Sequence, residues 1–119
     1  VAILVTHHHF DHVGALNYFE DKYSLKHNNL QNLDFEIIKN PGHSKDSISF
    51  YFKDLNIMFC GDFIFKNSIG RMGFEGGSEI EMQESLNMIS SYDDDIVLYP
   101  GHGPSTILGN EKSHFKYYF

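Results

Sequence analysis

Four potential metal ligands stand within six residues near the start of the sequence, in the pattern H-x-H-x-D-H: His7, His9, Asp11 and His12. Alternate residues of an extended segment point the same way, so the first three can converge while His12 reaches the site from the other side. Imidazole and carboxylate groups suit zinc, manganese and iron, and a catalytic site keeps an open position for water. A surface histidine run or an expression tag would not carry Asp11 and follow an apolar segment. The pattern therefore predicts a metal site.

Three further potential ligands follow apolar segments later in the chain, each directly after a glycine: His43, Asp62 and His102. A lone histidine in such a place is more often structural or solvated, and an aspartate after glycine often only forms a turn. Combined with the first cluster, however, these residues complete a ligand set for two metal ions. All seven side chains are predicted to be metal ligands.

The ligands are expected to lie on loops that follow strands. Apolar runs predict strands over residues 1–5, 35–39, 48–53, 57–60 and 96–99. A short polar connection of hairpin length joins the strands expected over 48–53 and 57–60. Helical spacing predicts helices over residues 13–23 and 106–112, and the segments 26–33 and 70–77 are expected to be loops.

A further helix is predicted to begin after Ser78. Glu81 stands three residues later, which is the capping-box pattern, and Met82, Leu86 and Ile89 mark a buried face. The aromatic tail 115–119 is expected to pack against the protein, and Cys60 alternates with apolar residues as a core thiol would.

Length, composition and net charge limit the classes of protein to which this sequence can belong. With 119 residues, 41% hydrophobic and 15% aromatic, residues 1–119 are expected to form a single domain around one core. A net charge of −7, from 16 acidic and 9 basic residues, disfavours nucleic acid and a membrane surface as partners. No stretch is long enough to span a membrane. Cys60 is the only cysteine, so an internal disulfide is excluded and a cytoplasmic location is expected. The sequence makes no prediction of oligomeric state.

The motifs, taken in order, resemble those of the metallo-β-lactamase fold superfamily. The resemblance is carried by Thr-His-x-His-x-Asp-His at residues 6–12, Pro-Gly-His at 41–43, Gly-Asp at 61–62 and Pro-Gly-His-Gly-Pro at 100–104. Within that superfamily, segments 41–47, 60–65, 68–71 and 109–112 look like the glyoxalase II branch, in which the enzyme is a hydroxyacylglutathione hydrolase.

This resemblance implies an α+β fold, the four-layer αβ/βα metallo-β-lactamase sandwich. The N-terminal strands of that sandwich are missing here, and the chain begins abruptly inside an expected strand, so we expect upstream sequence to be absent. Two divalent metal ions are implied, zinc first, with iron or manganese as alternatives. By the family's usual division, one ion is held by His7, His9 and His43 and the other by Asp11, His12 and His102, with Asp62 bridging them.

The implied activity is that of a metallo-hydrolase in which a metal-bridging hydroxide attacks a small-molecule thioester such as an acylglutathione. Asp11 is the expected catalytic residue, because it would both bind metal and orient the nucleophile. Arg71 is expected either to contact an anionic substrate or to serve as a structural hydrogen-bond donor. The helical C-terminal domain that holds glutathione in longer relatives is not matched, so the resemblance leaves the thiol carrier open.

Two alternatives remain open at this point. One is a mononuclear iron dioxygenase acting on glutathione persulfide, in which His7, His43 and Asp62 would form a facial triad. The other is an inactive fragment of the fold that keeps its metal ligands. A lactam, a lactone or a phosphodiester also remains possible as substrate, because one metal site serves many chemistries.

Overall fold

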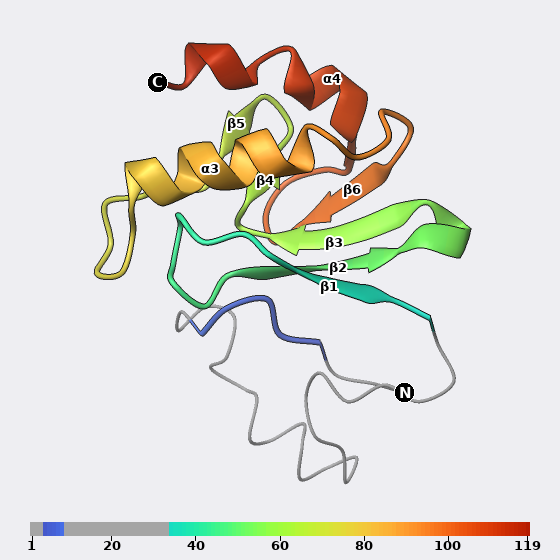
Figure 1. Cartoon of the computed structure of the whole chain (residues 1–119), viewed down its shortest axis with the longest axis horizontal. Helices are drawn as coiled ribbons and strands as arrows, with labels where there is room; N and C mark the ends of the chain where they lie inside the picture. Colours follow the sequence, from blue (N-terminus) through green and yellow to red (C-terminus); the bar gives the residue numbers. More distant parts are fainter. Residues whose placement is uncertain (1–3, 9–33) are drawn as a thin grey trace, which may run out of the picture.

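A five-stranded mixed sheet forms the centre of the protein (Figure 1). The computed structural model describes residues 4–8 and 34–119. The strand order is β1-β2-β3-β6-β7, and the strands are β1 (Glu36–Lys39), β2 (Ile48–Phe52), β3 (Ile57–Gly61), β6 (Val97–Pro100) and β7 (Thr106–Ile107). The four strands expected over residues 35–39, 48–53, 57–60 and 96–99 are therefore confirmed, with bounds shifted by one residue.

The directions of the strands determine where the loops that carry His43, Asp62 and His102 lie. β1 pairs antiparallel with β2, and β2 pairs antiparallel with β3, so β1 and β3 run in the same direction. β3 pairs parallel with β6. The C-terminal ends of β1, β3 and β6 consequently meet at one edge of the sheet. The connection between β2 and β3 is a hairpin closed by the 3₁₀ turn η1 (Lys53–Leu55), as its length predicts.

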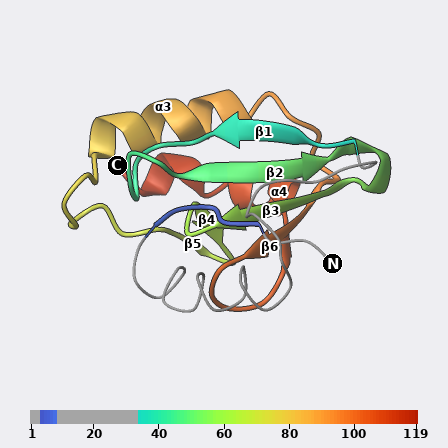
Figure 2. The same ribbon diagram turned by 90° about the horizontal axis from the view of Figure 1, so that it is seen from below.

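Helices cover one face of the sheet (Figures 1 and 2). Helix α3 (Glu79–Ile89) begins after Ser78, whose hydroxyl accepts a hydrogen bond from the Glu81 backbone N–H at 3.2 Å. The predicted cap is confirmed, although the structure records no bond from the Glu81 side chain back to Ser78. Met82, Leu86 and Ile89 are buried on the sheet side, as their spacing predicts.

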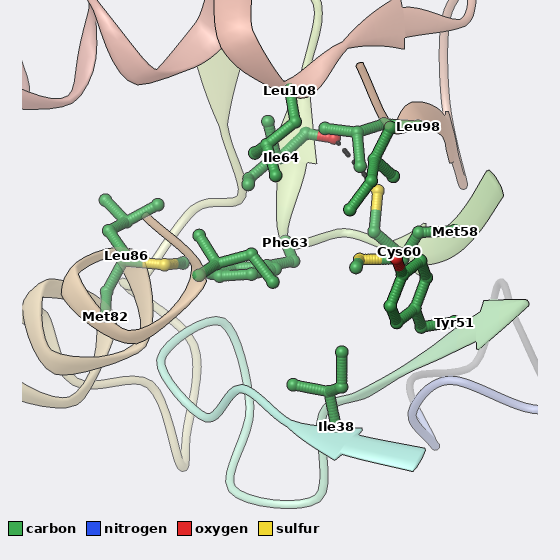
Figure 3. Close-up of a cluster of buried hydrophobic side chains, with 12 residues drawn as sticks. Ile38, Tyr51, Met58, Cys60, Phe63, Ile64, Met82, Leu86, Leu98 and Leu108 are labelled. Carbon is green, nitrogen blue, oxygen red and sulfur yellow. Dashed lines mark hydrogen bonds between the residues drawn. The ribbon is translucent and has the colours of Figure 1, made fainter. Parts of the chain in front are cut away.

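The core lies between α3, α4 (Leu108–Lys112) and the sheet (Figure 3). Its members include Ile38, Met58, Phe63 and Leu98. Cys60 is fully buried among them, as predicted, and burial raises the pKa of its thiol to about 12. The thiol also donates a hydrogen bond to the Ile64 carbonyl oxygen. Cys60 is therefore a packing residue.

A small second hairpin follows β3 and was not expected from the sequence. Strands β4 (Ile64–Phe65) and β5 (Ser68–Ile69) pair antiparallel, with Asn67 in the left-handed conformation at their turn. Strands of two residues are too short to show a period of two. This hairpin leads the chain from β3 into the glycine-rich loop 70–77.

Two expected elements differ from the structure. Residues 106–112 were expected to form one helix, but Thr106–Ile107 is strand β7 and only Leu108–Lys112 is helical, because Thr106 and Ile107 pair with Leu98 and Val97 of β6. Residues 4 and 5 were expected to end a strand, but the described residues 4–8 form none. The remainder of that strand, the helix over 13–23 and the loop over 26–33 lie outside the described residues.

The other face of the sheet is also apolar. Phe59 stacks on Tyr99 of the neighbouring strand with ring centroids 5.5 Å apart, and Phe52 contacts Phe59 edge-on. Residues 4–8 run along this side (Figure 1). The tail is helical at η2 (Phe115–Tyr117), where Phe115 packs against the core while Tyr117 and Phe119 are exposed. None of the helices in the described part of the chain has the length and apolarity that crossing a bilayer requires.

Candidate metal centre

Three of the predicted ligands come together at the sheet edge where β1, β3 and β6 end. His43 follows β1 after a short turn, Asp62 follows β3 directly, and His102 follows β6 by two residues. Gly101, which precedes His102, donates a backbone hydrogen bond to the Gly61 carbonyl at 2.8 Å. The parallel pairing of β3 and β6 thereby holds the loops of Asp62 and His102 side by side.

His7 enters the same place from the segment 4–8. Its approach depends on Gly61, which has a φ of +54° and lies directly against Thr6. A Cβ at Gly61 would stand 2.3 Å from the Thr6 hydroxyl oxygen, so any larger residue would push this segment away from β3. The Thr6 carbonyl accepts a hydrogen bond from the Ile48 N–H of β2 at 2.8 Å, which anchors the segment to the sheet.

The resulting four-residue site consists of His7, His43, His102 and Asp62. The Nε2 atoms of the three histidines lie 3.6 Å, 3.3 Å and 3.5 Å, in that order, from one oxygen, Oδ2 of Asp62. His7, His43 and Asp62 are buried, and each offers a ligand atom within 4.8 Å of those of the other two. The His102 side chain remains 57% exposed, so the site opens toward solvent on that side.

Contacts at the Nδ1 atoms fix the orientation of the two buried imidazoles, His43 and His7. His43 Nδ1 lies 2.7 Å from the Arg71 carbonyl oxygen, which can only accept, so Nδ1 carries a proton and Nε2 is the ring nitrogen that faces Asp62. His7 Nδ1 lies 3.1 Å from the Thr6 hydroxyl. Hydrogen bonds of this kind from the far ring nitrogen are the usual support of metal-binding histidines.

The separations between these atoms fit a metal ion. Two ligands at about 2.1 Å from a tetrahedral zinc ion stand about 3.4 Å apart, which is close to the three nitrogen–oxygen distances around Asp62 Oδ2. The donor set of imidazole nitrogen and carboxylate oxygen suits zinc, iron or manganese. His7, His43 and Asp62 therefore form a possible His/Asp metal site, with His102 beside them.

Aromatic rings flank the site. Phe74 of the glycine-rich loop is half exposed and meets the His43 ring edge-on at 5.6 Å. Phe65 of β4 meets the His102 ring at 6.0 Å. The hairpin and the glycine-rich loop thus supply apolar walls beside the exposed side of the site, and the sequence patterns gave no signal for either ring.

The remaining predicted residues are only partly placed. His9, Asp11 and His12 lie outside the described residues. Arg71 is exposed, and its carbonyl oxygen, rather than its guanidinium, contacts the site through His43. His8, which alternation predicts to point away from His7, contacts Asp46. Asp46, which accepts a hydrogen bond from Ser44, was not singled out from the sequence, although it lies within three residues of His43.

The chain belongs to the metallo-beta-lactamase superfamily, whose family model matches residues 1–27 and 24–102. It is 34% identical over 122 residues to a hydroxyacylglutathione hydrolase of Chromohalobacter salexigens, an alignment that covers 85% of this chain and 47% of the relative. It is 27% identical over 153 residues to the probable metallo-hydrolase YqgX of Bacillus subtilis, which covers 94% of this chain and 72% of the relative. The chain spans about half the length of the hydroxyacylglutathione hydrolases that it matches.

Solved structures agree with this fold. The protein is similar to the B3 metallo-beta-lactamase BLEG-1, with a TM-score of 0.86 and 28% identity, covering 98% of this chain and 76% of the other. It is also similar to TTHA1623, whose structure was solved in a di-iron-bound form, with a TM-score of 0.83 and 28% identity, covering 92% of this chain and 73% of the other. The expected metallo-β-lactamase fold is confirmed, as is the expectation that the chain represents part of it.

Proposed function

We propose that this chain carries the metal centre of a thioester hydrolase of the glyoxalase II type. The observation that carries the proposal is the convergence of three imidazole Nε2 atoms on one carboxylate oxygen of Asp62. In this proposal His7, His9 and His43 would hold one ion, Asp11, His12 and His102 would hold the other, and both ions would share Asp62.

The metal would supply Lewis acidity and would lower the pKa of a coordinated water toward neutrality. The chain's own residues would fix where that chemistry takes place. His43 donates its Nδ1 proton to the Arg71 carbonyl, so its Nε2 is the nitrogen that would bind the metal ion. Zinc is the first choice of metal, and iron or manganese fits the same donors.

A thioester substrate is supported by the relatives named hydroxyacylglutathione hydrolase, at 34% and 31% identity. A thiolate leaves readily, so cleavage of a thioester needs little help from a general acid. The site would then require only a hydroxide nucleophile, whose orientation we assign to Asp11, and a stabilised oxyanion. The exposed side at His102, flanked by Phe65, is where a small-molecule substrate would enter.

Arg71 is proposed as a substrate contact. Its backbone carbonyl oxygen accepts the bond from His43, and the residue is exposed. A guanidinium there could meet an anionic substrate group. The lone unpaired Cys60 and the net charge of −7 favour a cytoplasmic enzyme that acts on small molecules, with no nucleic acid or membrane partner.

The test combines metal analysis with a substrate panel. Purified protein is analysed for bound zinc, iron and manganese and is assayed on a glutathione thioester, a lactone, a β-lactam and a phosphodiester. We expect stoichiometric metal and fastest hydrolysis of the thioester. Asp62→Asn should lose both, whereas Asp95→Asn, a matched change of an exposed aspartate, should lose neither. Metal-free protein, or unchanged hydrolysis in Asp62→Asn, would refute the proposal.

The iron dioxygenase remains a second candidate because His7, His43 and Asp62 are the three residues that its facial triad requires, and they are adjacent and buried. The two activities differ in their co-substrate, because the dioxygenase consumes oxygen and the hydrolase consumes water. Oxygen uptake with a persulfide substrate and one bound iron would favour the dioxygenase, whereas thioester hydrolysis without oxygen uptake favours the hydrolase. A cooperative thermal unfolding transition would argue against an inactive fragment.

A further inference from the structure

The carboxylate of Asp46 joins two of the loops that carry the metal site. Its Oδ2 accepts a hydrogen bond from the His8 backbone N–H at 3.1 Å and lies 2.5 Å from His8 Nδ1. Its Oδ1 accepts a hydrogen bond from the Ser44 hydroxyl at 2.7 Å. His8 directly follows His7, and Ser44 directly follows His43. One side chain thus ties together the backbones that carry two of the buried imidazoles.

This contact spans a long separation in sequence. His8 and Asp46 are 38 residues apart, and the segment that bears His7 forms no strand within residues 4–8. The contacts that hold the segment include the Ile48 N–H bond to the Thr6 carbonyl and the bonds to Asp46. The bond to Ile48 lies on the N-terminal side of His7 and the Asp46 contacts lie on its C-terminal side. Together they bracket the imidazole.

We propose that Asp46 is a positioning residue, which holds His7 beside His43 so that both imidazoles are preorganised for metal binding. The inference rests on the proposed metal site and adds to it a residue that does not itself reach the site. The His7 and His43 rings stand edge to face with centroids 4.9 Å apart. The contacts of Asp46 with His8 and Ser44, here called the clamp, preserve this arrangement. Without the clamp, bringing the two loops together would cost binding free energy each time a metal ion enters.

The charge state of Asp46 agrees with this role. Partial burial alone would raise its pKa, but hydrogen bonds from Ser44 and His8 and the nearby His8 charge act the other way, and the pKa lies below its usual value of 3.8. The group is therefore a carboxylate at neutral pH, and both oxygens can accept hydrogen bonds.

Three variants separate positioning from general stability. Asp46→Ala removes both arms of the clamp. Asp46→Asn keeps the shape: its amide oxygen can accept from His8, and its NH₂ can donate to the Ser44 hydroxyl, which is free to turn. Ser44→Ala removes one arm only. Asp95→Ala, a change at an exposed aspartate of the turn before β6, is the control.

The measurement is the dissociation constant for Zn²⁺, by competition with a chromophoric chelator, alongside the thermal unfolding midpoint of each metal-free protein. We expect Asp46→Ala to weaken zinc binding about 10- to 100-fold, as loss of an outer hydrogen-bond partner does at other metal sites. Asp46→Asn should remain within about threefold of the unaltered chain, because an amide can serve both arms. Ser44→Ala should lie between the two, and Asp95→Ala should match the unaltered chain.

Several outcomes would overturn the inference. Unchanged zinc affinity in Asp46→Ala, with or without a lower unfolding midpoint, would show that Asp46 is only structural. Affinity in Asp46→Asn as weak as in Asp46→Ala would show that the charge, and not the hydrogen-bonded geometry, matters. If Asp46→Ala does not fold, unchanged affinity in Ser44→Ala refutes the clamp. If the unaltered chain binds no zinc, the proposed metal site fails, and that result is separate from the others.

Discussion

Gly70 stands where three parts of the candidate site touch, so its replacement tests the packing directly. A Cβ built at Gly70 would lie 1.7 Å from the Asp62 carbonyl oxygen, 2.9 Å from its carbonyl carbon and 3.2 Å from His43 Cβ. The next residue, Arg71, accepts the hydrogen bond that orients His43. Gly70→Ala should therefore disturb both the Asp62 loop and the support of His43.

The size of the effect follows from these distances. The Asp62 carbonyl or the glycine-rich loop must move by more than about 1 Å, because the obstacle is backbone and cannot rotate aside, and overpacking of this kind costs roughly 1–3 kcal/mol. Since a misplacement of about 1 Å at a reacting site can cost on the order of 100-fold in rate, we expect hydrolysis to fall by about that factor and zinc binding to weaken with it.

Gly73→Ala is the matched control in the same loop. A Cβ there meets nothing within 4 Å, so its free energy of unfolding should change by no more than about 0.5 kcal/mol. Both changes reduce the freedom of the unfolded chain equally, which removes that contribution from the comparison. Urea unfolding of the metal-free proteins and zinc competition give the two quantities. Equal stability and equal zinc affinity in the two variants would refute the packing argument.

Three further predictions concern titratable groups. Desolvation alone would raise the Asp46 pKa, but hydrogen bonds from Ser44 and His8 lower it below 3.8, so its stabilisation is present above that value and lost as pH falls through the folded-state pKa. The difference in unfolding free energy between the unaltered chain and Asp46→Asn should accordingly shrink between about pH 5 and pH 2, and a constant difference would contradict this. Burial and a hydrogen bond to Glu36 raise the pKa of Tyr92 to about 12, so the stability that this pair contributes is complete below pH 10.0 and lost as the pH rises through 12. The ultraviolet titration of the unaltered chain, after subtraction of the Tyr92→Phe titration, should have its midpoint near 12. A midpoint near 10.0 would count against this placement of Tyr92. Burial raises the pKa of the Cys60 thiol to about 12, so a disulfide reagent should label it at neutral pH only after unfolding, and rapid labelling of the native protein would contradict its placement in the core.

The sequence predicts the elements that leave a strong local pattern. β2 and β3 are runs of apolar residues separated by a polar turn, and Ser78 with Glu81 marks the start of α3, so both features are visible without a structure. The placement of His43, Asp62 and His102 after strands is equally readable, because a glycine precedes each of them. The structure adds that these strand ends share one edge.

Other features depend on contacts between distant residues and leave no such pattern. The hairpin β4–β5 has only two residues in each strand. Thr106 and Ile107 are β-branched and favour a strand, but two residues are too few to show a strand pattern, and only their pairing with β6 reveals it. The clamp of Asp46 on His8 joins residues 38 positions apart, so no local spacing could indicate it. Arg71 was considered for its side chain, whereas its carbonyl oxygen is the group that contacts the site.

We propose that imidazole and carboxylate groups, and not the thiol of Cys60, hold metal at the edge of this sheet. X-ray absorption at the zinc edge of the zinc-loaded protein distinguishes these ligands. We predict a shell of nitrogen and oxygen ligands at about 2.0–2.1 Å with imidazole scattering beyond it. The shell should be lost together with the zinc in Asp62→Asn but kept in Asp95→Asn. A sulfur ligand at about 2.3 Å, or a chain that retains no zinc, would show that these groups do not form the metal site.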